Sequence, residues 1–171
     1  MIAIVCLSED NGMAFNHRRQ SRDEKLIDYL ISRLSGKTLR MDPYSEDLFM
    51  KYKAMPASGE ISGECPINEE NHKEGSDRNL FTDLGVHMIV EEDYLEKAKE
   101  TDYCFVERED LLPYKDRILR LILCRWNRKY PMDQKLNLDL SEYRLRSSED
   151  IPGKSHDKIT IEVWDKRQDL H

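Results

Sequence analysis

The chain has 171 residues, with 27 Lys and Arg against 34 Asp and Glu, which gives a formal net charge of −7 at pH 7. A hydrophobic fraction of 39% and a mean hydropathy of −0.76 allow an economical core and exclude a fully disordered chain. The longest apolar run, residues 1–7, is far shorter than the ~20 residues that span a bilayer. We therefore expect one soluble, cytoplasmic domain over residues 1–171, with no membrane contact.

The cysteines also favour a cytoplasmic location. The four cysteines, Cys6, Cys65, Cys104 and Cys124, form no CxxC pair, and three of them lie in apolar runs. This pattern favours buried free thiols in a reducing environment over a zinc cluster or a disulfide framework.

The first third of the chain alternates strand and helix. The apolar run 1–7 ends at a turn signal, as a strand buried on both faces does. Ser21 and Glu24 have capping-box spacing, and apolar residues then recur at helical spacing as far as Gly36. The sequence predicts a strand at 1–7, a helix at 22–34, a strand at 38–41 and a helix over 44–53.

The regular pattern stops at residues 54–85. Six acids and only two bases fall within 59–79, with almost no large apolar side chain. We predict a long, exposed and partly mobile loop, whose charge is interpreted first as solvation.

The second half returns to strands and ends without a long helix. It predicts strands at 86–90, 103–106 and 118–124, a short helix at 92–99, a short helical or turn segment at 111–114, and closing strands at 135–138, 143–149 and 157–164. This order indicates a single α/β domain with a mixed sheet whose last strands are antiparallel.

Several common catalytic motifs are absent. The glycine positions do not allow G-x-G-x-x-G or a P-loop, and the histidines form no close metal-binding pair. Ser155-His156-Asp157 places the residue types of a triad side by side, but neighbours in a strand point to opposite faces. We predict that this tripeptide is a turn entering the last strand.

A basic cluster precedes the first helix. His17, Arg18, Arg19 and Arg22 lie between the end of the first strand and the helix start, where open α/β sheets bind ligands and helix N–H groups attract anions. The arginines could clamp a phosphate or carboxylate. Alternatively, the cluster is a solvated loop that pairs with the acids following it.

A second basic segment runs over 115–129 and includes Trp126, with Tyr130 next to it. Bases interleaved with aromatic residues can hold single-stranded nucleic acid. The acidic balance of the chain, with a sequence pI ≈ 5.3, argues against that reading. Pairing of this segment with the acidic loop or with a partner subunit is favoured, which allows a homodimer in which one segment docks on the other.

The order of elements resembles dihydrofolate reductase across nearly the whole chain. The opening Ile2-Ala-Ile-Val5 and the Asn11-Gly12 pair are similar to that family's first strand and turn, and the helix at 22–34 is similar to the helix lining the folate pocket. Residues 37–41, 112–114, 118–122 and the final strand pair also fit. The resemblance implies a three-layer α/β/α fold with a mixed, mainly parallel central sheet and antiparallel C-terminal strands.

The departures from this family fall at its functional positions. Arg18-Arg19-Gln20 stands where a reductase carries the Leu-Pro-Trp that shapes the pterin pocket, and the acid that assists proton delivery matches either Asp23 or Glu24. Asp42-Pro43 replaces the Gly-Arg that receives cofactor phosphate.

Glu107-Arg108 replaces the family's Gly-Gly pair, which lets the backbone approach the pyrophosphate. Side chains there would block that approach, and the introduced acids would repel phosphate. We therefore expect no cofactor, no NADPH binding in the family manner and no reductase activity. The residues assigned to a small anionic or nucleotide-like ligand in the vacated cleft are His17, Arg18, Arg19, Arg22, Asp23, Asp42 and Ser45.

The chain is also similar to small uncharacterised proteins labelled ribonuclease Z, although it lacks the H-x-H-x-D-H metal motif. Metal-independent RNA cleavage could use His17 as acid or base, with Arg18 and Arg19 holding the phosphate. Three readings follow: a binder of a small anion, an interaction module built on 59–79 and 115–129, and an enzyme, either a nuclease or a reductase.

Overall fold

The computed structural model describes residues 1–50, 54–56 and 78–168. Their elements, in chain order, are β1 (Ile2–Leu7), β2 (Gly12–Phe15), β3 (Arg18–Arg19), α1 (Glu24–Arg33), β4 (Thr38–Met41), α2 (Pro43–Phe49), β5 (Ala54–Pro56), β6 (Arg78–Thr82), β7 (His87–Val90), α3 (Tyr94–Lys97), β8 (Tyr103–Val106), the 3-10 helix η1 (Leu112–Tyr114), β9 (Arg120–Arg125), β10 (Gln134–Lys135), the 3-10 helix η2 (Leu140–Glu142), β11 (Tyr143–Pro152) and β12 (Lys158–Lys166).

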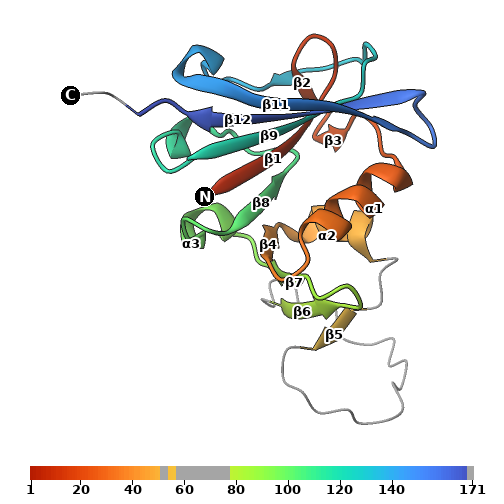
Figure 1. Ribbon diagram of the computed structural model, residues 1–171, viewed down its shortest axis with the longest axis vertical. Coiled ribbons are helices and arrows are strands. Elements are labelled where there is room, and N and C mark those ends of the chain that lie inside the picture. Colours follow the sequence, from red (N-terminus) through yellow and green to blue (C-terminus); the bar gives the residue numbers. More distant parts are fainter. Residues whose placement is uncertain (51–53, 57–77, 169–171) are drawn as a thin grey trace.

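One nine-stranded sheet organises the molecule, in the order β11-β12-β9-β1-β8-β4-β7-β6-β5 (Figure 1). Neighbours from β9 to β7 are parallel, and the strands outside them at both ends are antiparallel. The carboxyl ends of β1, β4 and β8 therefore open on the same side of the sheet. A second sheet, β10-β2-β3, is small and antiparallel.

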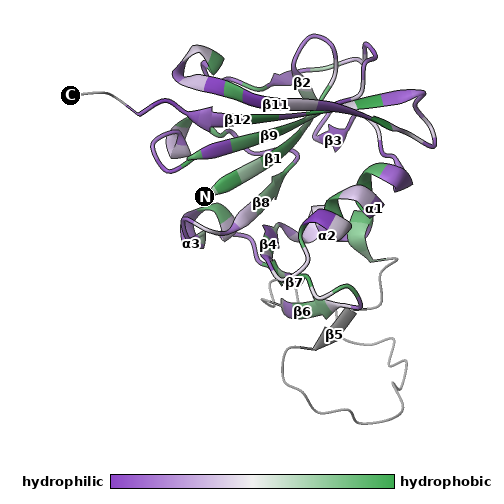
Figure 2. Ribbon diagram, in the orientation of Figure 1, coloured by the Kyte–Doolittle hydropathy of each residue, from purple (hydrophilic) through white to green (hydrophobic). Residues whose placement is uncertain are grey.

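Apolar side chains cover both faces of the central strands. On one face, α1 packs Leu26, Ile27, Leu30 and Ile31 against the sheet, in a cluster that also holds Phe49 of α2. The other face is covered by α3 and by irregular segments that contribute Leu111, Ile118 and Leu136. Because β1 is buried on both sides, it is apolar almost throughout, whereas β11 is mostly hydrophilic (Figure 2).

The start of α1 differs from the sequence prediction. Its N-cap is Asp23, whose carboxylate accepts the Lys25 N–H at 2.9 Å, so the helix begins at Glu24 and not at residue 22. The predicted capping serine, Ser21, lies outside the helix and hydrogen bonds to His156. Both residues are standard N-cap types, and the long-range partners decide between them.

The hairpin β2–β3 was missed by the sequence analysis. Its two turn residues, Asn16 and His17, have φ values of 49° and 58°. Positive φ at both central positions is the requirement of a type I′ hairpin turn, and asparagine tolerates that conformation well. The basic segment is therefore an ordered hairpin arm and not a loop.

The prediction of a continuous loop over 54–85 is wrong at both ends. Ala54–Pro56 and Arg78–Thr82 form β5 and β6, which extend the sheet beyond β7. The acidic part of the predicted loop, residues 57–77, lies outside the described residues. The helices predicted over 44–53 and 92–99 are shorter than expected, since α2 ends at Phe49 and α3 at Lys97.

The structure also bears on the predicted cysteines, the second basic segment and membrane-spanning helices. Cys104 and Cys124 are buried free thiols and Cys6 is a half-buried one, while Cys65 is outside the described residues. Among the described residues, Arg120 and Arg125 of the second basic segment pair with Asp165 and Glu162 of β12, whereas the acidic part of the predicted loop lies outside the described residues. No helix in the described ranges is long and apolar enough to cross a membrane.

Candidate functional site

The crevice at the carboxyl ends of the parallel strands is filled by side chains of the protein itself. Glu107 directly follows β8, and Arg19 reaches it from the β2–β3 hairpin with a forked contact of 2.9 Å and 3.2 Å. The second carboxylate oxygen of Glu107 also accepts the Ser45 hydroxyl at 2.8 Å. Glu107 is 7% exposed and Arg19 18%, so this ion pair is largely removed from water.

A second ion pair lies beside the first. Arg108 donates to the buried carboxylate of Asp42 at 3.0 Å, and Asp42 also caps α2 by accepting the Ser45 N–H at 2.8 Å. The Tyr44 ring lies between the two guanidinium groups, 4.3 Å from that of Arg19 and 3.8 Å from that of Arg108. The two arginines of this crevice are thus occupied by acids and by an aromatic ring.

The electrostatics of this network favour its charged form. Burial alone would raise the pKa of Asp42, but hydrogen bonds from Ser45 and Arg108 outweigh it and lower that pKa below its ordinary value. Burial alone would lower the pKa of Arg19, but its hydrogen bond to Glu107 and the attraction of nearby negative charge together raise that pKa above its ordinary value. We conclude that, among the described residues, the charges of Arg19 and Arg108 are each balanced by a carboxylate within the crevice.

Asp23 is also fully engaged. Its carboxylate accepts the backbone N–H groups of Lys154, Ser155 and His156 at distances from 2.8 Å to 3.2 Å, in addition to that of Lys25. The His156 ring contacts the same carboxylate through Nδ1 at 3.2 Å. Asp23 therefore fastens the β11–β12 connection to the start of α1.

His156 continues this arrangement on its other side. Its Nε2 is 2.8 Å from the Tyr130 hydroxyl and 3.3 Å from the Ser21 hydroxyl, and its ring stacks on Trp126 with centroids 4.6 Å apart. Ser155-His156-Asp157 is a turn before β12, as predicted, and the polar partners of His156 come from distant segments. These contacts have no local pattern by which they could be predicted.

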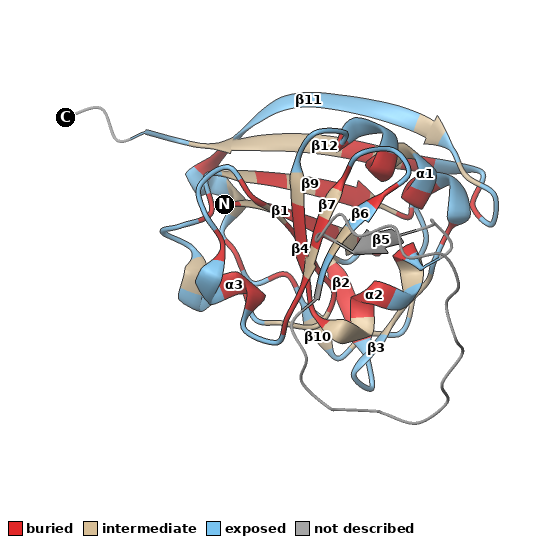
Figure 3. Ribbon diagram, turned by 90° about the horizontal axis from the view of Figure 1, so that it is seen from below, coloured by how far each residue is buried: buried red, intermediate tan, exposed pale blue. Residues whose placement is uncertain are grey.

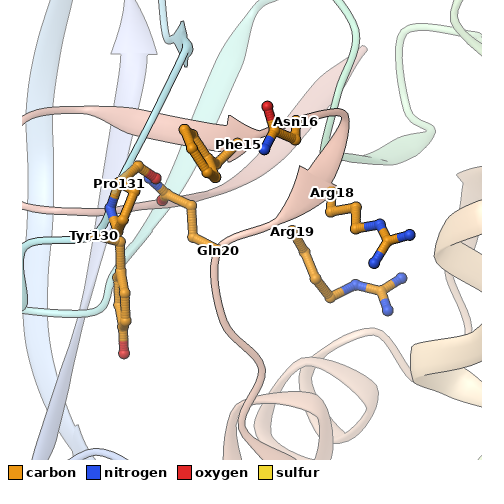
Figure 4. A pocket seen from close by; sticks show the side chains of 7 residues that line it. All are labelled: Phe15, Asn16, Arg18, Arg19, Gln20, Tyr130 and Pro131. Carbon is orange, nitrogen blue, oxygen red and sulfur yellow. The ribbon is translucent and has the colours of Figure 1, made fainter.

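A surface hollow of about 490 Å³ lies beside the β2–β3 hairpin, next to the filled crevice. It is lined by Phe15, Asn16, Arg18, Arg19, Gln20, Tyr130 and Pro131. Figure 4 shows Arg18 and Arg19 extending together toward one side, away from Tyr130 and Pro131. The hollow thus has a cationic end and an end formed by amide and aromatic groups.

Two polar groups of this hollow lack a partner. Arg18 is exposed, and its guanidinium makes no hydrogen bond or ion pair with the residues that the structure describes. The Gln20 amide nitrogen donates to Ser8 Oγ and to the Pro131 carbonyl, both at 3.3 Å. Since a carbonyl can only accept, this contact fixes the orientation of the amide, and Oε1 is left buried without a donor in the described chain.

The structure separates the predicted ligand residues. Arg18 and Arg19 line the hairpin hollow, whereas Arg22 lines a different one of about 590 Å³ with Glu24 and Lys154. His17 is exposed at the hairpin tip, so its assignment as an acid or base for RNA cleavage stays a prediction. Asp23, Asp42 and Ser45 are buried in the internal contacts above.

Other lining residues were not found from the sequence. Phe15, Gln20, Tyr130 and Pro131 complete the hollow, and only the hairpin signal of Asn16 could have brought Phe15 beside Arg18. No group of three or more potential metal ligands occurs in the described ranges.

These features define a single α/β domain with a mixed sheet, whose crevice at the strand ends is closed by ion pairs. In a comparison with solved structures, the chain is similar to dihydrofolate reductase from Enterococcus faecalis complexed with NADP(H) and RAB-propyl, with a TM-score of 0.57 and 8% identity. The match covers 98% of this chain and 96% of the other. No family model matches, and no curated protein sequence does.

The comparison establishes the dihydrofolate-reductase-like fold that the element order predicted. The predicted mixed sheet with antiparallel C-terminal strands is likewise confirmed. At 8% identity the likeness carries the fold alone, so activity and ligands must be argued from the site.

Proposed function

We propose that the protein binds a small anionic, nucleotide-like ligand in the hairpin hollow. The observation that carries this proposal is the hollow beside the hairpin, which is lined by an exposed Arg18 whose guanidinium has no ion pair among the described residues. Arginine binds phosphate and carboxylate groups through paired hydrogen bonds.

The shape of the hollow supports a ligand with two different ends. Phe15 lines it and is 42% exposed, which offers an aromatic face for a planar ring. The Gln20 and Tyr130 side lies away from the two guanidinium groups (Figure 4). A ligand with a phosphate or carboxylate at one end and a planar ring at the other matches this arrangement.

The strand-end crevice supports the further proposal that the protein does not carry out reductase chemistry of the family kind. In the strand-end crevice, the carboxylates of Glu107 and Asp42 would repel a dinucleotide's phosphates, and Arg19 and Arg108 are already paired with them. Asp23, which with Glu24 is one of two candidate acids for proton delivery, is 2% exposed and engaged with the 154–156 turn. Occupied space and charge thus support the proposal that NADPH does not bind in the family manner.

The binding proposal is tested by thermal unfolding with adenosine and guanosine monophosphates as probes. A ligand at ~100 times its dissociation constant stabilises by roughly 2.7 kcal/mol, which raises Tm by on the order of 5 °C. We expect a rise of this size for wild type with at least one nucleotide, and a loss of affinity of ~10-fold or more in Arg18→Ala.

The matched control is Arg22→Ala, because Arg22 is also an exposed arginine but lines the other hollow. It should keep the wild-type response. Equal loss in both variants would indicate unspecific attraction to positive charge, and no response in wild type would refute the proposal.

A further inference from the structure

β11 is an exposed edge strand of ten residues. In the described part of the chain it is paired along one side only, with β12, and no strand lies beyond it. Eight of its ten residues are exposed, and Figure 3 shows the strand on the outside of the molecule along most of its length. The opposite edge of the sheet, β5, has only three residues and includes a proline. The register of β11 against β12 shifts between Leu145 and Ser147, and on both sides of this bulge the long edge offers backbone groups to a further strand.

The charges on β11 are arranged in two blocks. Arg144 and Arg146 occupy its first half, Glu149 and Asp150 its second half, and Ser147-Ser148 separates the blocks. Proteins that avoid pairing between edge strands of two molecules carry like charges on those strands, which repel a second copy. A strand with a basic half and an acidic half has the opposite property, because antiparallel pairing with itself sets each basic block beside an acidic one.

We propose that two copies of this chain associate through antiparallel pairing of β11 with β11, centred on Ser147 of each copy. The pairing follows a two-fold axis, and because the bulge between Leu145 and Ser147 takes up one residue of the register, Arg144 of each copy lies opposite Glu149 of the other. Arg146 and Asp150 lie at neighbouring positions of the same two strands. The two nine-stranded sheets then form one continuous sheet. This proposal is independent of ligand binding in the hairpin hollow.

The existing contacts of these side chains leave room for the second copy. Arg146 pairs with Asp165 at 3.0 Å, Glu149 with Arg33 at 3.5 Å and Asp150 with Lys158 at 3.6 Å. The side chains of Arg146, Glu149 and Asp150 nevertheless remain 63%, 50% and 53% exposed. Arg144 has no ion pair with the described residues, so it is available to an acid of the second copy.

Sedimentation velocity of the full chain tests the proposal. We expect a species of twice the 20.3 kDa mass of one chain. Its dissociation constant should increase as ionic strength rises. The charge reversals R144E/R146E and E149R/D150R should each raise the dissociation constant on the order of 100-fold, because every cross-strand attraction becomes a repulsion. Circular dichroism of each variant checks that the fold is kept.

Mixing the two variants tests directly whether the charges of the two strands pair with each other. One then carries an all-acidic strand and the other an all-basic one, so an equimolar mixture should recover a heterodimer. The control R128E/K129E reverses two exposed bases of the 115–129 segment and should leave the wild-type mass unchanged. A wild-type monomer at low salt, a failure of the mixture to associate, or a monomer caused by the control alone would overturn the proposal.

Discussion

Replacing Arg40 by methionine is expected to lower the free energy of unfolding by about 3–5 kcal/mol. Arg40 lies on β4 in the centre of the sheet and is 8% exposed, and it donates to Asp102 at 2.7 Å and to Glu91 from the same guanidinium. Both acids are also buried. Methionine leaves these carboxylates without their main counter-charge, and the cost of burying them is then no longer offset.

Urea denaturation of wild type and Arg40→Met measures this loss. The matched control is Arg33→Met, which makes the same chemical change in the Arg33–Glu149 pair, where the arginine is 63% exposed. Exposed ion pairs contribute only ~0.2–1 kcal/mol, so the control should change stability little. Equal losses in the two variants would show that burial of the Arg40 group does not govern its contribution.

Replacing Asp23 by asparagine is expected to destabilise the protein by about 2 kcal/mol at neutral pH and by much less at pH 2. Burial would raise the pKa of Asp23, but hydrogen bonds from Lys154, His156, Ser155 and Lys25 lower it from its ordinary value of 3.8 to about 2. The folded state therefore favours the ionised carboxylate. That contribution is present above the unfolded pKa and is lost as pH falls through the folded one.

The measurement is urea denaturation of wild type and Asp23→Asn over a series of pH values. The difference between them should be constant above pH ~5 and should shrink between about pH 4 and pH 2, where wild type also loses its charge. Asp157→Asn, an exposed acid of the same turn, should follow wild type at every pH. A difference independent of pH would contradict the assigned role of the Asp23 charge.

Much of the fold could be predicted because its signals are local. The apolar run of β1, the helical spacing of Leu26, Ile27, Leu30 and Ile31, and the strands after residue 143 each depend on neighbours in sequence. β5 and β6 were missed because they are short and adjoin an acid-rich stretch that contains almost no apolar residue. β6 pairs with β7 and β5 pairs with β6, and neither pairing has a local pattern in the sequence.

The candidate site was harder to predict because its contacts join distant segments. Arg19 pairs with Glu107, 88 positions away, and Asp23 holds a turn more than 130 positions away. Arg18, Arg19 and Arg22 are close in sequence, yet only the first two lie on the hairpin, so the three do not share one hollow. Arginines that are close in the sequence therefore line two different hollows.

Calorimetric titration of the full chain with NADPH tests most directly the central claim that its own ion pairs close the strand-end crevice. The Arg19–Glu107 and Arg108–Asp42 pairs predict no binding heat at NADPH concentrations that saturate a reductase, and no oxidation of NADPH when dihydrofolate is added. Binding of NADPH with micromolar affinity that is unaffected by Arg18→Ala would contradict this account, because the crevice would then be open to the cofactor.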